Sequence, residues 1–198
     1  MEFVSLGSII YDLLNIIRGA QISDDEPITK KQIEAWVHQY RALFIKRDID
    51  KGKMINPSYI QSIDSIPLTL DTTRNLYHTT TIPSTIDFNY KSGLLYVGDI
   101  DGNAIQIIPE TRSVFQKYNK YSNDDTVAFL KDNKLYLNNS KGLQSISIRG
   151  VFQVPFDIST LNSVSYTYDS YYPIPISILP SLKKEILMNE LGIEYNAP

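Results

Sequence analysis

The apolar pattern of the chain changes near Ile66, and this change limits the possible folds more than any other feature of the sequence. Before this point, apolar residues recur at the spacing of amphipathic helices. After it, short runs rich in Thr, Tyr, Ile and Val alternate with Pro, Gly, Asn and Asp, a pattern typical of strands joined by turns. The sequence therefore predicts an α+β fold, with an N-terminal helical hairpin, a small antiparallel β domain in the middle and a C-terminal helix.

The first predicted helix covers residues 5–18 and ends at Gly19, which suits a left-handed C-terminal cap. Its apolar stripe is wide, and a wide stripe indicates contact with two surfaces, one in its own domain and one elsewhere. A core helix of a monomer is the alternative that the pattern leaves open. The stripe consists of Leu6, Ile9, Ile10, Leu13, Leu14, Ile16 and Ile17.

The second predicted helix begins at Thr29, which forms a capping-box signature with Gln32. We expect it to pair with the first helix as an antiparallel hairpin. Its apolar face comprises Ile33, Trp36, Val37, Tyr40, Leu43 and Phe44. The other face is predicted to be polar and carries Glu34, His38, Arg41 and Asp48.

Three consecutive segments follow from these patterns. Residues 1–55 form the helical hairpin, residues 66–178 the antiparallel β domain, and residues 179–198 a C-terminal helix and tail. Gly192 marks the predicted end of the last helix. Within the β domain, the stretch FLKDNKLYL predicts a hairpin whose tip spans Lys131–Lys134.

The composition excludes several classes of site. The 198 residues contain no cysteine, which removes disulfides, thiolate zinc sites, iron–sulfur clusters and thiol nucleophiles. With 19 basic and 22 acidic side chains, the net charge of −3 gives no general preference for nucleic acid or anionic membranes. The apolar N-terminus lacks both the basic start of a signal peptide and the ~20 apolar residues of a membrane span. We expect a cytosolic product without a cofactor, a metal or a membrane partner.

The stretch LLYVGDIDGNAIQI contains the strongest candidate for a metal site. Carboxylates at Asp99 and Asp101 can converge on a hard cation. A calcium loop counted from Asp99 has Glu110 at its twelfth position, but the sixth position, which requires glycine, holds Ala104. The pair of Asp101 and Gly102 also suits a tight turn between two strands. We favour the turn, and a cation site serving a cation-dependent enzyme is the alternative.

Other polar groupings give little support for catalysis. Asp124 and Asp125 are adjacent, and adjacent side chains of a strand point to opposite faces, so we favour a solvated loop over a shared proton or a metal. His38 lies one helical turn after Glu34, where a surface hydrogen bond is more common than a metal or proton-transfer pair. The sequence has no nucleophile elbow and no Gly-rich phosphate loop. We expect no enzymatic activity.

The densest aromatic stretch is YTYDSYY, Tyr166–Tyr172. Tyrosine is favoured at protein interfaces, although stacking on a sugar or a base uses the same surface, and a plain sheet surface is the simplest alternative. Few Lys or Arg residues surround the stretch, which favours a protein contact over nucleic acid. With the helical stripes, it gives the candidate protein-interface residues Ile9, Leu13, Ile16, Ile17, Trp36, Tyr40, Tyr168, Tyr171 and Tyr172.

Several longer stretches, in a fixed order, cover most of the chain. They are IYDLLNIIRGAQISDDEPITKKQIEAWVHQYRALFIKRDIDKG, INPSYIQSIDSIPL, TIPSTIDF, SIRGVFQVP and PIPISILPSLKKEILMNELGI. Taken together, they resemble a family of virion structural proteins from crAss-like and related tailed bacteriophages. Members of the family often carry cysteines in the early β region, which this chain lacks, so no thiol site is carried over. The family provides no catalytic residues to transfer.

The resemblance implies a head-to-tail connector, a ring subunit of the neck or tail that joins the portal to the tail around a central channel for the genome. It implies three kinds of protein partner: other copies of the chain, about twelve of which form a ring, the portal protein, and other neck or tail proteins. DNA is implied only as the genome that passes through the ring. Such a protein is located in the virion and made in the host bacterial cytoplasm. The alternative is a β-rich virion binding or decoration module that recognises a glycan or a protein partner.

Overall fold

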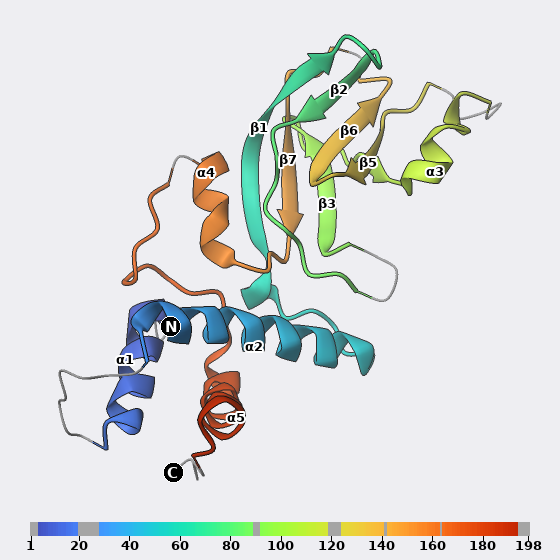
Figure 1. The fold of residues 1–198 in the computed structure, drawn as a ribbon. Coiled ribbons are helices and arrows are strands. Elements are labelled where there is room, and N and C mark those ends of the chain that lie inside the picture. Colours follow the sequence, from blue (N-terminus) through green and yellow to red (C-terminus); the bar gives the residue numbers. More distant parts are fainter. Residues whose placement is uncertain are drawn as a thin grey trace. The chain divides into compact units, whose positions relative to one another are not determined.

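The computed structural model describes residues 4–19, 28–88, 92–118, 124–140, 142–162 and 164–193. Contacts between residues group the chain into two units, whose elements are drawn in Figure 1. The helical unit comprises Met1–Ile60, Ile86–Tyr90 and Ser165–Pro198, and the β unit comprises Gln61–Thr85 and Lys91–Val164. The chain therefore forms the β unit from two segments that leave the helical unit and return to it. The predicted mixture of α and β structure is confirmed.

The long helices among the described residues belong to the helical unit. They are α1 (Leu6–Ile17), α2 (Lys30–Asp50) and α5 (Leu179–Leu191), and α2 packs against both of the others. Two short 3-10 helices, η1 (Pro57–Tyr59) and η4 (Ile176–Ile178), complete the described elements of this unit. Apolar side chains that interlock between these helices form its core.

The helix ends lie where the capping residues predict them. The Thr29 hydroxyl accepts a hydrogen bond from the Gln32 backbone N–H at 3.3 Å, and Ser5 caps α1 in the same way. Gly19 and Gly192 follow α1 and α5 with φ angles of 53° and 65°, in the left-handed region that glycine adopts at low cost. The predicted start at Thr29 and the predicted stops at both glycines are confirmed.

The β unit contains one seven-stranded sheet, in the order β3-β7-β1-β2-β6-β5-β4. Short helical segments, named α3 (Glu110–Ser113), η2 (Gln116–Tyr118), η3 (Pro155–Ile158) and α4 (Ser159–Asn162), accompany the sheet. The strands are β1 (Gln61–Asp71), β2 (Leu76–Thr79), β3 (Leu94–Asp99), β4 (Gln106–Ile107), β5 (Val127–Lys131), β6 (Lys134–Asn138) and β7 (Ser145–Gly150).

One strand pair departs from the predicted antiparallel sheet. β4 and β5 run parallel, with Gln106 opposite Val127, whereas the other recorded pairs are antiparallel. Parallel neighbours require a long crossover rather than a tight turn. The segment between β4 and β5, which contains α3 and η2, provides that crossover, so the prediction of a purely antiparallel domain is wrong at this edge.

The turn between β3 and β4 brings the two edges of the sheet together. Gly98 and Ala104 form an isolated antiparallel bridge, and the Val97 carbonyl accepts a hydrogen bond from the Ile105 N–H at 2.8 Å. At the turn itself, Gly102 has a φ of 89°. Since β3 and β4 stand at opposite ends of the strand order, these contacts nearly close the sheet on itself.

The hairpin predicted at FLKDNKLYL is also present. β5 and β6 pair in antiparallel register, with Lys131 opposite Lys134. Asp132 and Asn133 at the tip have φ angles of 49° and 56°. Two successive residues with positive φ are typical of a type I′ turn, whose twist matches that of the strands.

The predicted segments 1–55, 66–178 and 179–198 follow the order of the sequence, and as domain bounds they stay a prediction. In the structure, α5 shares a unit with α1 and α2, whereas α4 belongs to the β unit. Among the helices that the structure describes, none combines the length and the apolar character needed to span a membrane.

Replacement of Gly102 by alanine tests the turn that closes the sheet. An L residue is strained at a φ of 89°, so Gly102→Ala is expected to lower the free energy of unfolding by about 1 to 2 kcal/mol. Gly102→Asn is the matched control and should lose less, because asparagine tolerates positive φ. Urea unfolding followed by circular dichroism measures both. Equal losses for the two variants would contradict a conformational cause.

Candidate interaction surfaces

The predicted interface residues divide into a buried and an exposed group. Ile16, Ile17 and Trp36 are half-buried, and Tyr168 and Tyr171 are exposed. The buried group consists of Ile9, Leu13, Tyr40 and Tyr172. Because their own chain covers these four side chains, we do not propose that they contact another subunit.

The tyrosine-rich stretch is attached to the N-terminal part of the helical unit. The Tyr168 carbonyl accepts a hydrogen bond from the Gly7 N–H at 2.7 Å, and the Tyr168 hydroxyl donates to Glu34 Oε2 at 2.9 Å. The Tyr172 N–H donates to the Val4 carbonyl at 2.9 Å. These bonds fix the returning chain to α1 and α2, while an interface role for the exposed Tyr168 and Tyr171 stays a prediction.

A buried arginine lies at the centre of the helical unit. Arg41 of α2 is 0% exposed, and its Nε donates a hydrogen bond to the Pro173 carbonyl at 2.8 Å. The guanidinium carbon stands 5.6 Å from the centre of the Tyr59 ring and 5.8 Å from that of Tyr172. Aromatic faces attract cations, and more strongly where water is excluded. Arg41 therefore connects α2 with η1, which follows it directly, and with the segment at Tyr172 and Pro173, which is far away in the sequence.

His38 lies one helical turn before Arg41 and is also buried. Its Nδ1 is 2.8 Å from the Tyr172 hydroxyl, and its Nε2 is 3.8 Å from Glu34 Oε1. Burial is the largest influence on the His38 pKa and lowers it; Glu34 acts in the opposite direction. The imidazole is therefore a neutral member of the core at neutral pH.

The burial of His38 and Arg41 corrects the predicted polar face of the second helix. Helical periodicity alone places both residues on the solvent side, opposite the apolar stripe. In the structure, Tyr59 and the segment at Tyr172 and Pro173 cover this side of α2. The prediction was wrong for these two residues because it considered one helix without the chain that returns to it.

The carboxylates considered as metal ligands lie in a turn or on the surface. Asp99 Oδ1 accepts a hydrogen bond from the Asn103 N–H at 2.7 Å, and Asp99 Oδ2 accepts from Asn103 Nδ2 at 2.8 Å. These bonds lower the pKa of Asp99, which stays ionised as the acceptor within the turn. Asp124 and Asp125 are exposed. Across the described ranges, no three His, Asp or Glu side chains gather as metal ligands would.

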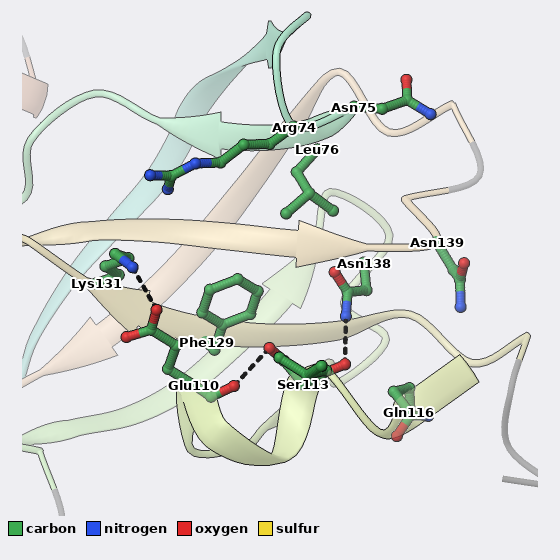
Figure 2. Close-up of a pocket in the computed structure, with 11 residues that line it drawn as sticks. Arg74, Asn75, Leu76, Glu110, Ser113, Gln116, Phe129, Lys131, Asn138 and Asn139 are labelled. Carbon is green, nitrogen blue, oxygen red and sulfur yellow. Dashed lines mark hydrogen bonds and ion pairs between the residues drawn. The ribbon is translucent and has the colours of Figure 1, made fainter. Parts of the chain in front are cut away.

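A cavity of about 720 Å³ in the β unit lies between α3 and the sheet (Figure 2). Leu76 of β2 and Phe129 of β5 supply apolar surface, and polar side chains surround it. Asn138 of β6 donates through Nδ2 to the Ser113 carbonyl of α3 at 3.2 Å. Phe129 is buried and stacks on Tyr136 with ring centres 5.4 Å apart, so its ring is not an open platform for a sugar.

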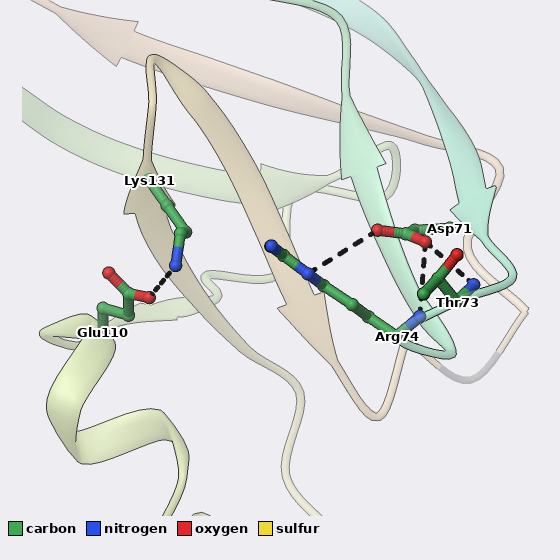
Figure 3. A network of polar contacts seen from close by, with 5 residues as sticks. All are labelled: Asp71, Thr73, Arg74, Glu110 and Lys131. Carbon is green, nitrogen blue, oxygen red and sulfur yellow. Dashed lines mark hydrogen bonds and ion pairs between the residues drawn. The ribbon is translucent and has the colours of Figure 1, made fainter.

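The charges at the rim of this cavity are paired within the unit (Figure 3). Lys131 forms an ion pair with Glu110, which joins β5 to α3. Arg74 lies 4.0 Å from Asp71 Oδ2, and Asp71 Oδ1 accepts hydrogen bonds from the Thr73 and Arg74 N–H groups. Because each cation has a carboxylate beside it, the rim is suited to neutral polar groups rather than to an anion.

Two further surfaces, one in each unit, carry exposed apolar side chains. The first, which we call the α3 ridge, consists of Val114, Phe115 and Tyr118, with exposed fractions of 61%, 63% and 72%. The second, the α2 hollow, is a depression of about 300 Å³ between the end of α2, η1 and η4. Met54 on its rim is 95% exposed. Exposed apolar groups that cluster in this way mark contact sites.

Sequence reasoning missed both surfaces. The ridge lies in a segment without helical or strand periodicity, and the only local signal was the apolar pair Val114 and Phe115 shortly after Pro109. The hollow combines Ile45 and Ile49 with Ser177 and Ile178, which are separated by more than half of the chain. No spacing rule connects residues so far apart.

Loss of the buried guanidinium is expected to destabilise the helical unit. Arg41→Ala removes a charged hydrogen bond and leaves the Pro173 carbonyl buried without its donor, which costs about 3 kcal/mol of unfolding free energy. Arg47→Ala is the control, because Arg47 forms a surface ion pair with Glu185 worth less than about 1 kcal/mol. Urea unfolding followed by the fluorescence of Trp36 reports on this unit. Equal losses in the two variants would rule out the special role of Arg41.

The buried His38 predicts a loss of stability at mildly acidic pH. The folded-state pKa is below the ordinary value of 6.5, so the unfolded chain takes up a proton first as the pH falls below 6.5. The free energy of unfolding should therefore decrease from pH 7.5 to pH 5.5. His38→Gln should reduce this dependence, because glutamine does not titrate. A wild-type stability that is constant or rises towards pH 5.5 would show that His38 is not held neutral.

Comparison with known families accounts for nearly the whole chain. Residues 8–198 match a family described as phage tail ring protein 2. No curated protein sequence matches the chain. The family match agrees with the resemblance found in the ordered sequence stretches, which is thereby confirmed. The chain belongs to the phage tail ring protein 2 family of crAss-like bacteriophages.

Proposed function

We propose that this protein is a connector subunit that joins the portal of the capsid to the tail. Family membership already assigns a structural, ring-forming role in the phage tail and a place in the virion. The proposal adds that about twelve copies close into a ring, that the ring contacts portal and other neck or tail proteins, and that DNA crosses it only as the passing genome. Synthesis in the host bacterial cytoplasm is part of the proposal.

The match over residues 8–198 is the observation that carries this proposal. A ring arises when one patch of a subunit binds a different patch of the next copy and the rotation closes. The exposed apolar side chains of the α3 ridge are compatible with such a contact.

We further propose that the protein acts mechanically and not as an enzyme. The carboxylate with the strongest claim to chemistry, Asp99, accepts two hydrogen bonds from Asn103 within a turn. His38 is buried and hydrogen-bonded to Tyr172. These side chains serve the fold in the positions where a catalytic role was considered.

The alternative of a glycan-binding or decoration module has no specific support. It relied on the tyrosine-rich stretch as a stacking surface. Tyr172 is fully buried, and the Tyr168 hydroxyl is bonded to Glu34. The connector role is therefore the better supported function.

Assembly of the purified chain, alone and with portal protein, tests the connector role. Mass photometry is expected to show a species near twelve times the chain mass of 22.6 kDa, either spontaneously or after portal is added. Negative-stain microscopy of the same sample should show closed rings bound to portal. A persistent monomer that ignores portal would contradict the proposal.

A further inference from the structure

We propose that the α3 cavity, the space of about 720 Å³ between α3 and the sheet, binds an extended, uncharged segment of another virion protein. The inference rests on the contacts with neck or tail proteins stated under the proposed function. It deepens that proposal, because it names the site of one such contact and the chemistry of the partner. The volume of the cavity is within the range of ligand-binding pockets.

The interior of the α3 cavity combines an apolar surface with side-chain amides. Leu76 and Phe129 supply the apolar surface. Gln116, Asn138 and Asn139 lie together on one side of Phe129 (Figure 2). Each amide has both a donor and an acceptor, as a peptide group does. A polypeptide in the cavity can therefore bond its main chain to these amides and place an apolar side chain against Leu76 and Phe129.

Exposed apolar side chains continue from the cavity to the surface. Val114 directly follows α3, lines the cavity and is 61% exposed. Phe115 and Tyr118 of the same segment are also more than half exposed. An ion or a small metabolite would occupy the cavity alone, whereas a polypeptide also covers apolar groups beside it. The exposed residues therefore favour a polypeptide.

The charges of the cavity disfavour ionic ligands. Lys131 forms an ion pair with Glu110. Arg74 lies beside Asp71, and its guanidinium carbon is 5.7 Å from the centre of the Tyr136 ring. Nucleic acid requires basic side chains that can contact phosphates, and these two are already paired. A charged peptide would have to displace one of the pairs, whereas an uncharged segment leaves both intact.

The partner segment comes from a different protein, because the chain uses its own uncharged segments in its fold. Its two longest runs without charge are residues 170–182 and 75–86. The first contains the fully buried Tyr172 and the start of α5. The second contains β2 of the sheet.

A peptide array probed with the labelled full chain tests the proposal. The array displays short overlapping peptides from the portal and the other neck and tail proteins of the same phage, together with peptides of this chain. The protein is expected to select uncharged peptides with an apolar residue at the centre. Replacement of a neutral residue of a selected peptide by Asp or by Lys should weaken binding at least about fivefold, because it brings an unpaired charge into the cavity. Selection of charged peptides, of peptides from this chain or of none would overturn the inference.

Val114→Asp tests whether the selected peptides bind at the α3 cavity. It places a charge at the mouth of the cavity, so binding should weaken at least about fivefold. The melting temperature should stay close to that of the wild type, because the side chain is exposed. Ile100→Asp is the matched control, since Ile100 is 72% exposed and lies between β3 and β4, outside the cavity. Equal binding by the two variants would contradict the site.

Glu110→Gln tests the role of the paired charges. It leaves Lys131 without this carboxylate, so binding of the Asp-substituted peptide should recover at least about threefold, while the Lys-substituted peptide should not recover. Glu185→Gln is the control, because it removes the carboxylate of a surface ion pair with Arg47 in the helical unit. The absence of recovery in Glu110→Gln, or the same recovery in both variants, would contradict the charge argument.

Mass photometry of the wild-type chain with portal separates this inference from the proposed function. Rings that bind portal while the chain selects no peptide contradict only the α3 cavity as the site. A lasting monomer that ignores portal contradicts the connector role.

Discussion

The buried guanidinium of Arg41 is the constraint on which the helical unit depends. A charge removed from water must be compensated nearby, and here a main-chain carbonyl and two aromatic rings compensate it. The carbonyl belongs to Pro173, whereas one of the rings belongs to Tyr59. The residues before and after the β excursion are thus held at the same point on α2. This arrangement explains how a chain that leaves the unit after Ile60 returns to a fixed place at Pro173.

Local sequence patterns predicted helix ends and turns. Tertiary contacts determined which strands pair and which side chains are buried. Thr29 and Gly192 marked helix ends because capping depends on neighbouring backbone groups alone. The turn at Gly102 and the hairpin at Lys131–Lys134 could be predicted for the same reason. The parallel pairing of β4 with β5 could not, since it results from the path of the α3 crossover. The burial of Arg41 was missed because the residues that cover it, Tyr59, Tyr172 and Pro173, lie outside the helix itself.

The candidate interaction surfaces show the same division. The tyrosine-rich stretch attracted attention by its composition, yet it serves to fix the returning chain, as the bond between Tyr172 and His38 shows. The α3 ridge has an ordinary composition and became visible only when the exposure of its side chains was known. The exposure of a side chain depends on whether other parts of the chain cover it. The residue pattern of a single segment does not contain that information.

The division into two units gives a ring subunit a simple mechanical design. Each unit has its own set of buried apolar residues. The near-neutral charge of the chain fits an assembly that is held by apolar burial rather than by salt-sensitive ion pairs.

Cryo-electron microscopy of the intact virion, with reconstruction of the neck and tail, tests the central claim most directly. We expect this chain to form a closed ring between portal and tail. Location of the chain on the capsid surface or on fibres would contradict the connector role.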